Sequence, residues 1–139
     1  MSEQIKHECG IAFIRLLKPL EYYYSRYGTT LYGINKLHLL MEKQHNRGQD
    51  GAGVASIKLN ITPGNKYIDR IRSNAQAPID DIFKQIYKPF QDIQSKDPEK
   101  LNDSDFLKKK VPFFGEVFMG HLRYGTFGKN NIENLHPVV

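Results

Sequence analysis

The chain has 139 residues, of which 40% are hydrophobic, 12% aromatic and 25% charged, close to the averages of globular domains. This composition excludes an intrinsically disordered tail, a collagenous fibre and a membrane bundle, and no apolar stretch approaches the roughly 20 residues of a transmembrane helix. Lys and Arg number 20 against 15 Asp and Glu, a net charge of +5, but the two signs are interleaved, which favours a solvated surface over a nucleic-acid interface.

The chain contains one cysteine, Cys9, which cannot form an internal disulfide. A lone cysteine is typical of proteins in a reducing compartment, so we expect a cytoplasmic protein in which any chemistry at Cys9 is thiol chemistry. The preceding residues 1–8 mix charges and have no apolar core, which excludes a secretory signal.

In chain order, the first half predicts two strands that flank two helices. The apolar run at 9–15 is typical of a buried strand. A short helix is expected over 18–27, opened by Pro19 and closed by Gly28. Apolar residues at helical spacing predict a second, amphipathic helix: Leu31, Ile34, Leu37 and Met41. After a polar turn, residues 52–59 predict a second buried strand.

The second half continues with a strand, a helix and a strand. Residues 67–72 favour a half-exposed strand, and Ile79, Ile82, Phe83 and Ile86 mark an amphipathic helix. Because Pro89 removes a backbone donor and clashes with the preceding turn, this helix is expected to kink or stop near Lys88. Residues 92–110 are rich in Asp and Lys and predict a surface insertion. Residues 115–124 predict the last strand.

The predicted order β-α-α-β-β-α-β indicates a layered domain of the α+β or α/β class, with helices on at least one face of the sheet. Residues 136–139 are typical of the beginning of a further strand. The sequence therefore favours a piece of a larger protein over a self-contained domain.

A lone buried cysteine most often serves as a small hydrophobic residue, and a catalytic Cys9 would need an activating base. A thiol with a pKa of about 8.5 requires a base or a positive neighbour to be a good nucleophile at neutral pH. His45 and His121 are candidates, but no spacing links either to Cys9. Cleavage between Glu8 and Cys9 would supply an α-amine with a pKa of about 7.7–8.0, which can accept the thiol proton. A peptide nitrogen cannot, so an uncut Cys9 would lack this base.

Three segments resemble, in the correct order, the motifs of class II glutamine amidotransferases. They are 9–11 (Cys-Gly-Ile), 47–53 (Arg-Gly-Gln-Asp-Gly-Ala-Gly) and 120–128 (Gly-His-Leu-Arg-Tyr-Gly-Thr-Phe-Gly). Members of this family are N-terminal-nucleophile hydrolases, so the resemblance implies a four-layer αββα sandwich, truncated here at its C-terminal end. The last two segments and 134–137 are most similar to the amidophosphoribosyltransferase branch.

The resemblance implies a role for each matching residue. Cys9 would attack the side-chain amide of glutamine, release ammonia and leave a thioester that water hydrolyses, with its own α-amine as the base. Arg123 would hold the α-carboxylate of glutamine, since a guanidinium fork meets a carboxylate with two parallel hydrogen bonds. Thr126 would line the substrate pocket, and Arg47 would lie close to it. The alternative for both arginines is a surface salt bridge.

The resemblance also implies a division of the chain. Residues 1–8 would be a leader that must be removed, and 9–139 would form a partial amidotransferase domain in which 60–114 match poorly and look like an insertion. The family's Asn-Gly oxyanion motif and the aspartate that binds the substrate amine do not occur before Val139. Since loss of an oxyanion donor lowers the rate about 100- to 1000-fold, we expect little or no glutaminase activity from these 139 residues alone.

The implied function is the supply of ammonia for phosphoribosylamine formation in purine biosynthesis. The implied partners are glutamine and, through a separate phosphoribosyltransferase domain, phosphoribosyl pyrophosphate with Mg²⁺. We expect a homo-oligomer, no membrane and no cofactor in this chain, whose five histidines show no metal-ligand spacing. Gly48, Gly51 and Gly53 are interpreted as backbone turns, and His121 as structural.

Three alternatives remain open at the level of sequence. The first is another class II amidotransferase with a different acceptor. The second is a catalytically silent binding or regulatory module that keeps residues 1–8 attached. The third is a basic nucleic-acid-binding domain, although the chain shows neither a helix with clustered Lys and Arg nor an aromatic stacking platform. Whether the mature protein keeps residues 1–8 distinguishes an active amidotransferase from the silent module.

Overall fold

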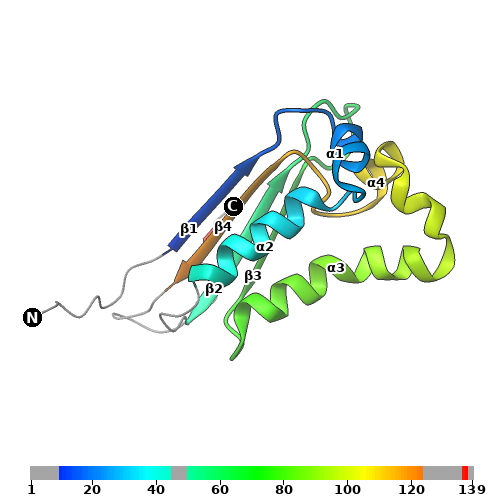
Figure 1. Ribbon diagram of the computed structural model, residues 1–139. Coiled ribbons are helices and arrows are strands. Elements are labelled where there is room, and N and C mark those ends of the chain that lie inside the picture. The colour runs from blue at the N-terminus through cyan, green and yellow to red at the C-terminus, as the bar shows by residue number, and fades with distance from the viewer. Residues whose placement is uncertain (1–9, 45–49, 124–135, 138–139) are drawn as a thin grey trace, which may run out of the picture.

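The computed structural model describes residues 10–44, 50–123 and 136–137. Its centre is a four-stranded antiparallel sheet with the strand order β1-β4-β2-β3 (Figure 1). The strands are β1 (Gly10–Arg15), β2 (Gly51–Ile57), β3 (Ile68–Ser73) and β4 (Val117–Arg123). The last of these four strands in sequence thus lies between the first two.

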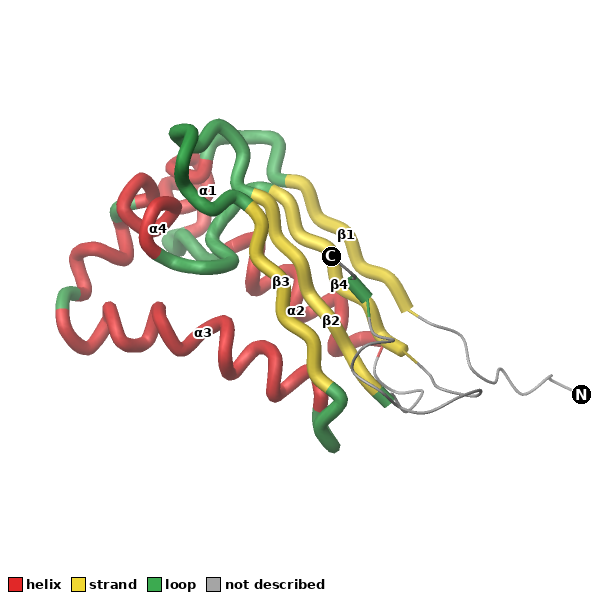
Figure 2. Tube along the Cα trace, turned by 180° about the vertical axis from the view of Figure 1, so that it is seen from behind, coloured by secondary structure: helices red, strands yellow, loops and turns green. Residues whose placement is uncertain are grey.

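The helices form one layer on one face of this sheet. They are α1 (Leu20–Tyr27), α2 (Tyr32–Gln44), α3 (Pro78–Lys96), the 3₁₀ helix η2 (Pro98–Asn102) and α4 (Ser104–Lys110). Helix α2 packs on β1 and β4, and α3 packs on β2 and β3. Seen from behind, the sheet lies in front of the helices (Figure 2). The domain is therefore a mixed α+β fold, and the predicted order of strands and long helices is confirmed.

The first two predicted helices are confirmed, although α1 begins at Leu20 and not at Lys18. Helix α1 follows Pro19 and ends at Gly28, whose φ of 76° is left-handed and whose N–H donates to the Tyr24 carbonyl oxygen. Glycine adopts this conformation without the penalty that a Cβ brings. In α2 the predicted residues Ile34, Leu37 and Met41 are almost fully buried, whereas Leu31 precedes the helix and is partly buried.

The helix was expected to kink or stop near Lys88, and the stop is wrong, because α3 continues through Pro89 to Lys96. Phe90, one residue after the proline, is buried in the core, and Ile93 packs against the same cluster one turn further on. Tertiary burial of this apolar stripe outweighs the missing backbone hydrogen bond. The helix thereby reaches across two strands.

The prediction of a polar surface insertion over 92–110 is also wrong in part. This segment ends α3 and then forms η2 and α4, in which Leu107 is completely buried and Leu101 and Phe106 pack against the core. Asp103 caps α4, since its carboxylate accepts a hydrogen bond of 3.1 Å from the Phe106 N–H. The apolar residues are sparse among the charges, but they anchor the segment.

The two faces of the sheet differ sharply in their exposure. On the helix side, Val54, Phe118 and Leu122 are buried. On the other side, Ile11 is 68% exposed and Phe13 is 61% exposed, although both are large and apolar. Successive residues of a strand point to opposite faces, so the same strands supply both surfaces. We call the second surface, formed by Ile11, Phe13, Ala55, Ile57, Ile68, Val117 and Met119 with their neighbours at the same alternation, the open face.

Candidate functional site

Three strand ends meet at one end of the sheet, and each adjoins a sequence motif. Strand β1 begins at Gly10, which pairs with Leu122 of β4, and β2 begins at Gly51, which pairs with Arg123. Because β4 runs antiparallel to both neighbours, its last residue lies where they begin (Figures 1 and 2). The second and third motifs begin 38 and 111 residues after the first in the sequence. The strand order brings their attachment points together.

Of the predicted site residues, the structure describes Arg123, whereas Cys9, Arg47 and Thr126 lie outside the described residues. Arg123 is the last residue of β4, is half-buried and belongs to the open face. Its carbonyl oxygen accepts a hydrogen bond of 2.8 Å from the Asp50 N–H. This bond joins the second motif to the third.

The end of α2 is tied to the beginning of β1. The Gln44 amide Nε2 donates a hydrogen bond of 3.3 Å to the Ile11 carbonyl oxygen, and its Oε1 lies where a Cβ on Gly10 would be. Gln44 is the last described residue before the second motif, and Gly10 follows Cys9 in the chain. The helix layer therefore fixes the same end of the sheet.

Gly53 is a point of close approach, which corrects its interpretation as a turn residue. It lies within β2, as Gly51 does, and a Cβ at Gly53 would overlap the carbonyl of His136. The segment His136–Pro137, joined by a cis peptide bond, thus crosses the open face directly over the strand. Only glycine leaves room for this crossing.

His121 lies beside this crossing on β4. Its ring meets the His136 ring edge to face at 4.9 Å, and its Nδ1 is buried without a hydrogen-bond partner among the described residues. Burial, and then the nearby His136 and Arg123, lower the pKa of His121 below its ordinary value of 6.5. Around it lies a pocket of about 600 Å³, lined by Ile11, Met119, Gly120, His121, His136 and Pro137.

A second polar cluster lies at the opposite end of the sheet. The buried Lys58 Nζ donates to the carbonyl oxygens of Lys108 and Val111 at 2.7 and 2.8 Å. Glu116, also buried, accepts from Lys108 Nζ at 2.9 Å and from the Leu59 N–H at 3.1 Å. Burial lowers the pKa of Lys58. These bonds fasten α4 to the ends of β2 and β4, which is a structural role.

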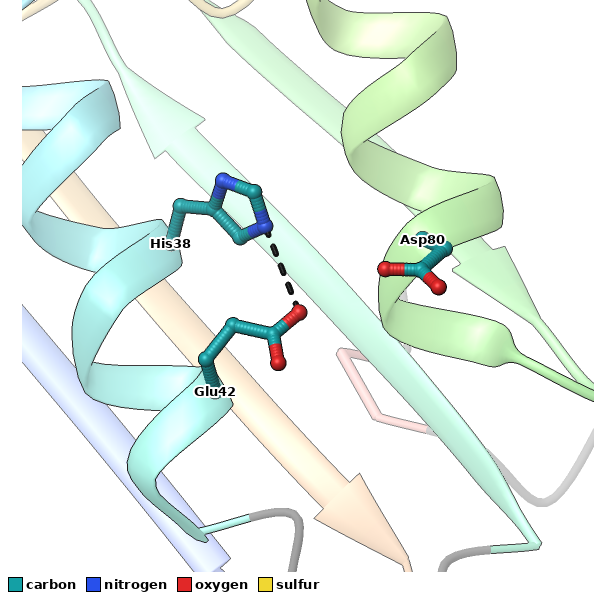
Figure 3. Close-up of side chains that lie close together, drawn as sticks. All are labelled: His38, Glu42 and Asp80. Atoms are coloured by element: carbon teal, nitrogen blue, oxygen red, sulfur yellow. Dashed lines mark ion pairs between the residues drawn. The ribbon is translucent and has the colours of Figure 1, made fainter.

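A third cluster of polar side chains, on α2 and α3, was not predicted from the sequence. His38 and Glu42 lie on one face of α2, and Asp80 faces them from the first turn of α3 (Figure 3). The His38 Nε2 is 3.4 Å from the Glu42 Oε1. The spacing of four residues between His38 and Glu42 is a signal that the sequence carries, but Asp80 joins them only through the packing of two helices.

Comparisons of the chain with protein-family models, with curated proteins and with solved structures find no significant match. The family resemblance therefore rests on the motifs and on where the fold attaches them. Within the described residues, no helix is both long and apolar enough to cross a membrane.

Proposed function

We propose that this chain is the glutaminase portion of a class II glutamine amidotransferase of the amidophosphoribosyltransferase type. One observation carries the proposal: the three segments that resemble the family's motifs attach to the same end of one sheet, at Gly10, Gly51 and Arg123. Residues that act on one substrate must come from neighbouring positions, and chance similarity of three short segments would not require this convergence.

The position of Arg123 supports its proposed role as the ligand of the glutamine α-carboxylate. It ends β4 on the open face, at the same end of the sheet as Gly10. A guanidinium can hold a carboxylate through two parallel charge-assisted hydrogen bonds, which positions an amino acid as well as attracting it. A substrate held here would extend toward the beginning of β1, next in sequence to Cys9.

In the chemistry that we propose, the first residue of the processed chain supplies both the nucleophile and the base. The Cys9 thiol gives its proton to its own α-amine, and the sulfur attacks the carbon of the glutamine side-chain amide. The protonated amine gives the proton to the leaving nitrogen, the carbon–nitrogen bond breaks, and ammonia leaves. Water then cleaves the γ-glutamyl thioester to glutamate and restores the thiol. Ammonia would serve phosphoribosylamine formation, while Mg²⁺ and phosphoribosyl pyrophosphate would belong to a separate phosphoribosyltransferase domain.

The open face supports the finer proposal of an αββα sandwich. Its exposed apolar side chains, including Ile11, Phe13 and Met119, lie together on adjacent strands β1 and β4. Contiguous exposed apolar patches on one sheet are unusual on a finished surface, and a second sheet packed face to face would cover them. We therefore propose that the described sheet and helices are one half of the sandwich.

The proposal is tested on the protein purified from the cells that make it. N-terminal sequencing should begin at Cys9, and a diazoketone analogue of glutamine should label Cys9 and no other residue. Arg123→Lys should slow labelling about 10- to 100-fold, because one charge replaces a bidentate contact, while labelling by a neutral thiol reagent stays unchanged.

Arg15→Lys is the matched control, since Arg15 also lies on the open face but at the other end of β1. It should leave analogue labelling unaltered. A mature protein that still carries residues 1–8 and resists the analogue would contradict the proposal and favour the silent module. Glutamine turnover supported by such an uncut chain would overturn the role of the α-amine.

A further inference from the structure

We propose that His38, Glu42 and Asp80 form a binding site for a divalent transition-metal ion that links α2 to α3. The three side chains offer one imidazole nitrogen and two carboxylate oxygens, and these ligand atoms lie within 4.8 Å of one another. Nitrogen and oxygen donors of this kind suit Zn²⁺ and its neighbours in the first transition series. The site lies on the helix layer and is independent of the proposed glutaminase chemistry.

The distances fit a metal with little movement. Zinc–nitrogen and zinc–oxygen bonds of about 2.0–2.1 Å place two ligands of a tetrahedral site roughly 3.3 Å apart. The His38 Nε2 and Glu42 Oε1 are 3.4 Å apart, so this edge of the tetrahedron already exists. Asp80 is exposed and can rotate toward them (Figure 3). Three protein ligands would leave the fourth position to water.

The imidazole is held in place by the core. The His38 ring stacks on the Phe83 ring at 4.2 Å with an interplanar angle of 13°, and Phe83 is buried. The Nε2 atom points toward Glu42 (Figure 3). One helical turn away, the Tyr87 hydroxyl donates a hydrogen bond of 2.7 Å to the Asn35 Oδ1, which fixes the two helices relative to each other. The donor set is therefore largely preorganised.

Charge also favours a cation at this place. Two carboxylates, Glu42 and Asp80, bring two negative charges to within 4.8 Å, and like charges at this distance repel. Lys84, the next basic residue along α3, is exposed and makes no ion pair among the described residues. A divalent ion would be attracted by both carboxylates, and it would stabilise only the folded chain, where α2 and α3 lie side by side.

The test measures Zn²⁺ binding by calorimetry and the thermal midpoint with and without Zn²⁺, in a Cys9→Ser background so that the thiol takes no metal. One ion per chain should bind, and free zinc at about 100 times Kd should raise the midpoint by roughly 8 °C. His38→Phe keeps the stacking on Phe83 but removes the nitrogen. This variant and Asp80→Asn should each weaken binding at least about tenfold.

Asp92→Asn is the matched control, because it removes an exposed carboxylate from the same helix, beside Lys88 rather than His38. It should bind zinc as the parent does. The comparison uses the zinc-induced shift and not the midpoint itself, since Asp80 also interacts with the positive end of α3. Absence of binding, or equal binding by the parent, His38→Phe and Asp80→Asn, would overturn the proposal.

Discussion

The two faces of the sheet are built from the same four strands, yet helices cover one face and the other is largely exposed. On the helix side, α2 and α3 bury Val54, Phe118 and Leu122. On the open face, Ile11 and Phe13 remain exposed, and the described segment that crosses it is His136–Pro137. The difference teaches that local sequence specifies both faces, while only the covered one has gained its free energy of burial.

The largest expected effect is a difference in stability between two phenylalanine substitutions, one on each face. Phe118→Ala should lower the free energy of unfolding by about 3–5 kcal/mol, because Phe118 is buried and packs closely over Gly33 of α2. Phe13→Ala should change it by less than about 1 kcal/mol, since most of the Phe13 side chain already contacts solvent. Urea unfolding of the 139-residue chain measures both.

The same pair sharpens the proposal of a second sheet. In the protein isolated from its cells, a layer packed on the open face would bury Phe13, and Phe13→Ala should then destabilise it by an amount approaching that of Phe118→Ala. Equal, small effects of Phe13→Ala in both settings would mean that nothing covers this face. Phe118→Ala serves as the internal reference, since Phe118 is buried between β4 and the helix layer in both settings.

A smaller and opposite effect is expected in the helix that completes the covered face. Pro89→Ala should raise the free energy of unfolding by about 1–3 kcal/mol. Alanine restores an N–H that can donate to the Gln85 carbonyl oxygen, and it removes the clash of the ring with that carbonyl. Lys84→Ala, at an exposed position of the same helix, is the control and should have little effect. A destabilised Pro89→Ala variant would show that α3 needs the proline.

The sequence predicted most of the fold where the signal was local. The stripe of Ile34, Leu37 and Met41 and the left-handed Gly28 identified two helices, since periodicity and capping act over a few residues. The predicted helix stop at Pro89 failed because the burial of Phe90 is a tertiary effect, which helix propensities do not include. The segment 92–110 misled because Leu107 is one buried residue among many charges.

The candidate sites depend even more on tertiary structure. The motifs of the proposed glutaminase could be recognised one by one, but their meeting at Gly10, Gly51 and Arg123 follows from β4 lying between β1 and β2. No spacing in the sequence encodes that strand order. Asp80 likewise joins His38 only because α3 packs beside α2. The sequence suggested the chemistry that we propose for the first site, and only the fold brought the residues of the second together.

The smallest expected effect is a dependence of stability on pH that comes from His121, where His136–Pro137 crosses the open face. The pKa of His121 in the folded chain lies below 6.5, mainly because the ring is buried. As the pH falls through about 6.5, the unfolded chain therefore binds a proton at His121 that the folded chain binds only at a lower pH. Stability present at pH 7.5 should be partly lost by pH 5, and His121→Phe should remove this part of the loss.

A second variant separates the two causes of that lowered pKa. His136→Phe keeps a ring at 4.9 Å from His121 but removes the group whose charge opposes protonation. Because burial is the larger cause, most of the loss between pH 7.5 and pH 5 should persist in His136→Phe, as measured by urea unfolding at both pH values. If His121→Phe loses as much stability on acidification as the parent, the surroundings of His121 do not hold it neutral. The crossing segment would then leave His121 as accessible to solvent as Phe13 is.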